Sequence, residues 1–175
     1  MNSKILPQIK NKLKDLLKDK EILDVLMFGS LIKGKIFPRD IDVALITNKN
    51  INPRIEGFHI SIIKPNEFFS NQPTLANTLL REGYSLKYKK FLAELLNFQN
   101  KILFIYELSS KTASKKVKIV NILRGRAMQE GMVKKNKGEW LANQVFTIPI
   151  EAGYLFEQFF LNFSIKFKKY FILMH

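Results

Sequence analysis

The first apolar residues of the chain recur at helical spacing between lysines and aspartates: Ile5, Leu6, Ile9, Leu13, Leu16 and Leu17. This spacing predicts an amphipathic helix, whose opening turn tolerates Pro7. The next apolar runs are short and bounded by turn residues, and they predict strands over 24–28, 40–46 and 58–63. After the first of these strands we expect a turn at Gly29 and a short helix, capped by Ser30 and ending near Gly34.

From Pro65 onward the pattern becomes mostly helical. It predicts a single turn at 67–70, helices over 75–81 and 86–96, and a strand over 102–106. A polar, turn-rich segment at 108–114 is the predicted domain boundary. Beyond it we expect a helix (117–123), a glycine-punctuated basic segment (124–138), a strand (144–148), a helix (151–162) and a last strand (165–173). The order predicts an α+β protein with a domain over 1–108 and a small basic α/β domain over 109–175.

Composition narrows the class of protein. No apolar run approaches the length of about 20 residues that crosses a bilayer, and residues 1–7 contain no apolar stretch of signal-peptide length. We therefore expect a cytoplasmic protein without membrane partners. The chain has no cysteine and only two histidines, which excludes disulfides, thiolate zinc sites and a multi-histidine metal site.

The charge balance favours a polyanionic partner. The formal net charge is +14, with 24 lysines and 5 arginines. Lysine is a mobile point charge, so nucleic acid would be held through its backbone more than through base edges. The alternative interpretation is that the many Lys, Ile, Asn and Phe codons reflect coding bias.

The lysines of the C-terminal part form clusters, and six of them are candidate nucleic-acid contacts: Lys115, Lys116, Lys118, Lys134, Lys135 and Lys137. Trp140 lies next to the second group and could stack on an unpaired base or pack inside the domain. The phenylalanines at 156, 159, 160, 167 and 171 are expected in the core. This region could grip a nucleic-acid acceptor, dimerise, or extend the core.

The strongest chemical pattern is Gly29-Ser30, nine residues, and then Asp40-Ile41-Asp42, with an apolar strand on each side. Side chains at i and i+2 of a strand point to the same face, so Asp40 and Asp42 can converge on Mg²⁺ or Mn²⁺. A glycine turn lets a phosphate approach the backbone. Further candidate contacts for a nucleoside triphosphate lie in the connection: Lys33, Lys35 and Arg39.

This pattern resembles the signature of the polymerase-β-like nucleotidyltransferase superfamily, including its minimal members, over about residues 24–106. The resemblance implies a mixed sheet packed against helices and transfer of a nucleoside monophosphate from a nucleoside triphosphate. It implies that Gly29 and Ser30 bind the triphosphate, and that Asp40 and Asp42 are catalytic metal ligands.

Catalytic members typically carry a third carboxylate on a later strand, which here corresponds to 58–63. The positions facing the site are His59 and Ser61, and neither is a carboxylate. Glu56 and Glu67 flank the strand. His59 could act as a ligand or general base, or be an ordinary polar residue on a half-exposed strand.

Three functions remain open from the sequence. The first is a magnesium-dependent nucleotidyltransferase acting on a hydroxyl of a nucleic acid or protein. The second is a nucleic-acid-binding protein on a nucleotidyltransferase fold with weakened catalysis. The third is the antitoxin-like partner of a toxin, by analogy with the minimal members, although these lack a basic extension. Nucleotide, acceptor and oligomeric state stay open.

Overall fold

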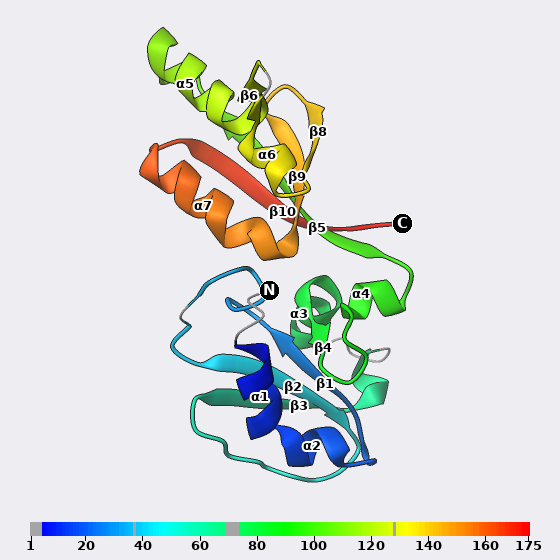
Figure 1. The fold of residues 1–175 in the computed structure, drawn as a ribbon. Helices are drawn as coiled ribbons and strands as arrows, with labels where there is room; N and C mark the ends of the chain where they lie inside the picture. Colours follow the sequence, from blue (N-terminus) through cyan, green and yellow to red (C-terminus); the bar gives the residue numbers. More distant parts are fainter. Residues whose placement is uncertain (1–4, 37, 69–73, 128) are drawn as a thin grey trace. The chain divides into compact units, whose positions relative to one another are not determined.

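The structure is a computed structural model that describes residues 5–36, 38–68, 74–127 and 129–175. Within these ranges the chain alternates helices and strands and is of the α+β class (Figure 1). It divides into two compact units, residues 1–100 with 175, and residues 101–174. No helix in the described ranges is long and apolar enough to span a bilayer.

The first unit is built on a four-stranded mixed sheet in the order β3-β2-β1-β4. β2 pairs antiparallel with β1 and parallel with β3. The elements of this unit before the second sheet are α1 (Leu6–Lys12), α2 (Lys14–Lys18), β1 (Ile22–Phe28), β2 (Ile41–Thr47), β3 (Phe58–Ile63), the 3₁₀ turn η1 (Pro65–Phe68), α3 (Thr74–Glu82), β4 (Tyr84–Ser85) and α4 (Leu92–Leu95).

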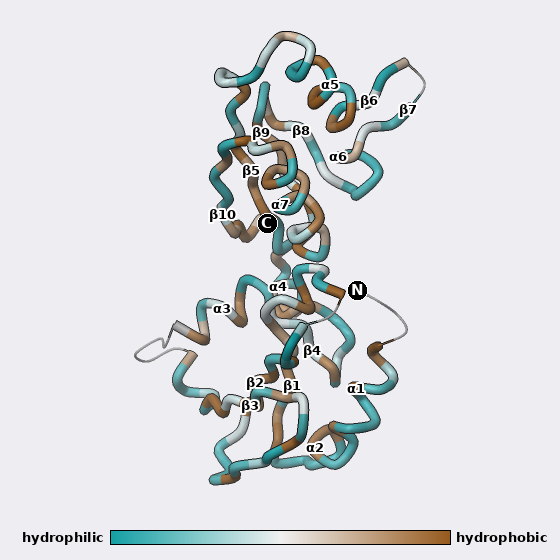
Figure 2. The backbone as a smooth tube through the Cα atoms, turned by 90° about the vertical axis from the view of Figure 1, so that its left-hand side faces the viewer, coloured by the Kyte–Doolittle hydropathy of each residue, from teal (hydrophilic) through white to brown (hydrophobic). Residues whose placement is uncertain are grey.

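Alternation along β1 and β2 gives the sheet two apolar faces, and Figure 2 shows hydrophobic positions along both strands. One face holds Leu26, Ala44 and Ile46, which pack with Ile63 against Leu79 of α3. α1 and α2 lie across the sheet in Figure 1, and Ile9 and Leu13 are buried there. Each face is therefore covered by a different helical segment.

The second unit has its own four-stranded sheet, in the order β10-β5-β9-β8. Its elements are β5 (Gln99–Glu107), α5 (Ala113–Arg124), the short strands β6 (Gly125–Arg126) and β7 (Gln129–Glu130), α6 (Met132–Lys135), β8 (Glu139–Ala142), β9 (Val145–Pro149), the 3₁₀ turn η2 (Ile150–Ala152), α7 (Gly153–Asn162) and β10 (Lys166–Met174). β6 and β7 form a separate hairpin.

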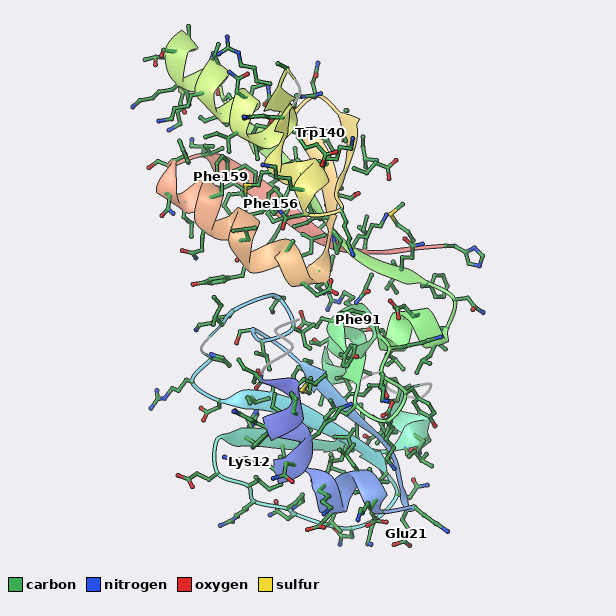
Figure 3. The ribbon with its side chains drawn as sticks, viewed as in Figure 1. Lys12, Glu21, Phe91, Trp140, Phe156 and Phe159 are labelled. Atoms are coloured by element: carbon green, nitrogen blue, oxygen red, sulfur yellow. The ribbon has the colours of Figure 1, made fainter. Side chains whose placement is uncertain are left out.

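An aromatic core fills this second unit. Phe104, Phe146, Phe156 and Phe160 are fully buried, and their rings lie 5.2–6.2 Å apart between centroids. Trp140, on β8, packs against the same group and is labelled with Phe156 in Figure 3. The expectation of buried phenylalanines is confirmed for 156 and 160, whereas the rings at 159, 167 and 171 are half-buried.

Several sequence predictions of local structure need correction. The first helix is interrupted at Leu13, whose ψ of 12° separates α1 from α2. The helix expected over 86–96 is only α4, because Lys89 has a φ of +59° and the preceding residues turn back onto β1. β8 and the β6–β7 hairpin were not predicted. The single turn expected at 67–70 is η1, and Ser70 lies outside the described residues.

The division between units also differs in place from the predicted boundary. β5 pairs antiparallel with β9, and most of this strand belongs to the second unit. The sequence-based boundary at 108/109 had assigned the same strand to the first domain.

Candidate functional site

The turn after β1 is tight and is closed by backbone hydrogen bonds. Lys33 N–H donates to Gly29 O at 3.3 Å, and Lys35 N–H donates to Ser30 O at 3.0 Å. Gly29 and Gly34 both have positive φ, at +79° and +95°, a region that favours glycine. The chain here forms successive turns and no helix. The expected helix capped by Ser30 is therefore wrong.

Asp42 lies directly against this turn. It pairs in register with Phe28 at the end of β1, and a Cβ placed on Gly29 would overlap its Oδ2 atom. Its side chain is 33% exposed, so one side of the carboxylate is packed on the glycine backbone and the other is open to solvent. Glycine is needed at position 29 for two reasons: its backbone conformation and the room for Asp42.

Asp40 lies just before the strand that carries Asp42. β2 begins at Ile41, so Asp40 precedes the strand and is exposed. The alternation that was expected to align Asp40 with Asp42 therefore does not fix its direction. Among the residues that the structure describes, no group of three or more His, Asp or Glu side chains is arranged to hold a metal ion.

The neighbouring strand brings His59 to Asp42. β2 and β3 pair in parallel with Asp42 opposite His59 and Ala44 opposite Ser61. His59 Nδ1 lies 3.4 Å from Asp42 Oδ1, and the imidazole is 71% exposed. Ser61 lies two residue pairs further along the two strands, opposite Ala44. Of the two candidate third positions, His59 is the one in contact with Asp42.

The two glutamates that flank β3 do not complete the site. Glu67 Oε2 accepts the N–H of Lys64 at 2.8 Å, so this carboxylate caps the start of η1. Glu56 is exposed, and its backbone carbonyl accepts a hydrogen bond from Lys12 at 3.5 Å.

A carboxylate that the sequence did not single out supports the glycine turn. Glu82, the last residue of α3, accepts the N–H of Gly29 on Oε1 at 3.3 Å and pairs through Oε2 with Lys33 Nζ at 3.2 Å. Its side chain is only 8% exposed. No sequence signal distinguishes it, because a glutamate at a helix end is common on protein surfaces. Glu82 holds the turn against α3 and gives Lys33 a structural partner.

The other two basic residues of the connection lie differently. Lys35 is half-buried beside the turn, whereas Arg39 is exposed and lines a pocket of about 360 Å³ with Ile41 and Phe58. That pocket lies under α1, on the face of β2 opposite to Asp42, since Ile41 and Asp42 alternate along the strand. The geometry groups Gly29, Asp42, His59, Lys33 and Glu82, and leaves Arg39 on the other side.

The candidate nucleic-acid contacts lie on two helices of the second unit. Lys115, Lys116 and Lys118 are on α5, Lys134 and Lys135 on α6, and Lys137 just after it. Trp140 is half-buried and Arg124 covers its ring, with the guanidinium carbon 4.1 Å from the ring centroid. Of the two interpretations of Trp140, internal packing is the one that the geometry favours.

Comparisons with models of known protein families, with curated proteins and with solved structures return no match to this chain. A functional assignment therefore depends on the chemistry of the site itself.

Proposed function

We propose that the first unit is a nucleotidyltransferase that moves a nucleoside monophosphate from a nucleoside triphosphate to an acceptor hydroxyl. The observation that supports it best is the packing of the Asp42 carboxylate on the Gly29 turn. A turn whose backbone lies beside a solvent-facing carboxylate can hold a phosphate group next to a carboxylate-bound cation. The pattern resembles the superfamily signature at these same residues.

The donor set fits a magnesium or manganese ion shared with a triphosphate. Mg²⁺ is usually held by one or two protein carboxylates and completes its shell with water and phosphate oxygens. Asp42 is half-exposed and Asp40 is exposed, so both are accessible to such a complex. The ion would stabilise negative charge on the transferring phosphate and on the leaving pyrophosphate.

The protein's own residues would bind and orient the reactants. The acceptor oxygen forms a bond to the α-phosphorus, and the bond from that phosphorus to the bridging oxygen of pyrophosphate breaks. The proton of the hydroxyl would pass to a base on the open side of Asp42, where the His59 imidazole lies. Glu82 keeps Lys33 and the Gly29 turn in place for the phosphates.

Incubation of the full chain with labelled nucleoside triphosphates, Mg²⁺ or Mn²⁺ and total RNA or lysate tests this proposal. We expect label transfer by the wild type and its loss in Asp42→Asn. Glu67→Gln is the matched control, because that carboxylate caps η1 and should be dispensable for transfer. Transfer that persists in Asp42→Asn, or no transfer by the wild type, would refute the proposal.

A second candidate is supported by two observations. The position beside Asp42 holds His59 in place of a carboxylate, and the second unit concentrates basic residues on α5 and α6. Both fit a nucleic-acid-binding protein on a fold with weakened catalysis. Under this candidate, Asp42→Asn leaves the biological activity intact, and nucleic-acid binding falls steeply with added salt.

A further inference from the structure

The positive charge of the second unit is concentrated in one segment. Residues 113–138 contain 8 lysines and arginines and a single acid, Glu130. The rest of the unit, residues 101–112 and 139–174, contains 5 basic and 4 acidic residues and is nearly balanced. The excess is therefore a local property of α5, the β6–β7 hairpin and α6, which neighbour one another in Figure 1.

These three elements line an open groove of about 690 Å³. Two glycines allow the elements to lie this close. A Cβ on Gly125, which has a φ of +94°, would overlap the carbonyl oxygen of Gln129, and a Cβ on Gly131 would overlap the end of α5. The groove is therefore formed by backbone packing and does not depend on the orientation of long side chains.

The basic residues of the segment divide into two groups. Lys118, Arg126 and Lys135 line the groove, and within the described part of the chain none of them forms an ion pair. Others are already engaged: Lys134 Nζ lies 2.9 Å from Glu130 Oε1, and Arg124 stacks on Trp140. The same ion pair neutralises Glu130, the acid that lines the groove. The groove thus presents three available cations.

The groove also contains apolar surface that a purely phosphate-binding site does not need. Val117 is 59% exposed, and Ile122 and Met132 are half-buried along the same walls. An unpaired strand presents both phosphates and base faces, whereas a duplex hides its base faces in the stack. The volume is that of a pocket for a drug-sized molecule, which suits a few unpaired nucleotides.

We propose that the groove between α5, the β6–β7 hairpin and α6 binds single-stranded nucleic acid. Lys118, Arg126 and Lys135 contact its phosphates, and Val117, Ile122 and Met132 contact its bases. The inference gives the nucleic-acid-binding candidate a location and a strand preference. It holds whether or not the first unit transfers nucleotides, so its test is separate from the transfer assay.

Fluorescence anisotropy of the full chain with a labelled unstructured oligonucleotide, and with a hairpin duplex of equal charge, tests the proposal. The wild type should bind the single strand more tightly. The triple variant Lys118→Gln, Arg126→Gln, Lys135→Gln should weaken binding at least tenfold. Since each phosphate contact to a single strand contributes about 0.7 to the slope of log K against log salt, the slope should become shallower by about 2.

A matched triple variant separates a groove from diffuse charge. Lys111→Gln, Lys166→Gln, Lys168→Gln removes the same charge from lysines of the same unit that do not line the groove. The affinity of this control variant for the single strand should fall by less than threefold. Val117→Ala keeps the charge and favours the helix. It should weaken binding of the single strand and leave binding of the duplex unchanged. The proposal would be overturned if the two triple variants lost affinity equally, or if the wild type bound the duplex more tightly than the single strand.

Discussion

Gly29 and Gly57 have almost the same backbone conformation and very different surroundings. Their φ angles are +79° and +80°, but a Cβ on Gly29 would overlap Asp42 Oδ2, whereas a Cβ on Gly57 would meet nothing within 4 Å. Alanine at either position would strain the backbone, but only alanine at position 29 would also displace the Asp42 carboxylate. Each substitution by alanine should lower stability by about 1–2 kcal/mol from the left-handed conformation alone.

We predict that Gly29→Ala abolishes nucleotidyl transfer and Mn²⁺-dependent nucleotide binding, and that Gly57→Ala retains both. Thermal unfolding measures the loss of stability that both variants share. The transfer assay and titration with a fluorescent nucleotide measure the loss of function that we expect only in Gly29→Ala. Equal activity of the two variants at matched stability would show that the contact between Gly29 and Asp42 has no functional role.

Two buried threonines differ in the state of their hydroxyl groups. Thr147 Oγ1, on β9, has no hydrogen-bond partner among the described residues. Thr47 Oγ1, at the end of β2, donates to the carbonyl of Glu21 at 2.7 Å and accepts the N–H of Lys49 at 3.0 Å. Burial of an unpaired hydroxyl is unfavourable, whereas loss of a satisfied one leaves its partners unpaired.

We therefore predict opposite effects of the same substitution. Thr147→Val should stabilise the protein by about 1 kcal/mol, and Thr47→Val should destabilise it by about 1–2 kcal/mol. Denaturant unfolding followed by circular dichroism measures both. Destabilisation by Thr147→Val would mean that its hydroxyl has a partner in solution.

At the scale of elements, the register between β2 and β3 decides which residue of β3 lies beside Asp42. The parallel pairing puts His59 at that position and Ser61 beside Ala44. If transfer is limited by the missing carboxylate, an acid should help at position 59 and not at position 61. A positioned acid–base group contributes about 10²–10⁴-fold to a rate.

We predict that His59→Asp raises the Mg²⁺-dependent rate of transfer by about tenfold or more, and that Ser61→Asp does not. Both variants introduce the same charge on the same strand, so a general electrostatic effect would appear in both. A lower rate in His59→Asp would instead show that the imidazole itself serves as ligand or base.

The sequence predicted elements well where the local pattern and the tertiary environment agree. The strand over 58–63 is observed with those bounds, because its apolar residues alternate and Gly57 and Pro65 delimit it. The apolar spacing over 86–96 suggested a helix, but Ser85 Oγ donates to the buried Asp24 and Leu86 N–H donates to Val25 O. Burial raises the pKa of the Asp24 carboxyl. These long-range contacts hold the segment on β1.

The site was predictable to a similar extent. Gly29 and Asp42 were identified because their residue types and spacing are distinctive, and the structure brings them into contact. Glu82 was not identified, because its role depends on where α3 ends relative to the turn. The two compact units divide before β5, earlier in the chain than the predicted boundary. The local pattern does not encode the sheet partner of a strand, and β5 pairs with β9 about forty residues later.

At the scale of the whole molecule, the two candidate activities depend on residues of different compact units. Asp42 belongs to the unit formed by residues 1–100 and 175, and the groove belongs to residues 101–174. We predict that Asp42→Asn retains the affinity and salt dependence of single-strand binding. The groove triple variant should retain Mn²⁺-dependent nucleotide binding, since it alters only residues of the second unit.

Transfer to an RNA acceptor then distinguishes how the units contribute. If the acceptor strand occupies the groove, the groove variant raises the KM for RNA with little change in kcat, whereas Asp42→Asn lowers kcat. Steady-state transfer at varied RNA concentration measures both constants. If the groove variant leaves the KM for RNA unchanged while it abolishes single-strand binding, the groove serves a bound strand other than the acceptor. The positive charge of residues 101–174, which hold 13 basic and 5 acidic residues, would then reflect a separate binding function of the second unit.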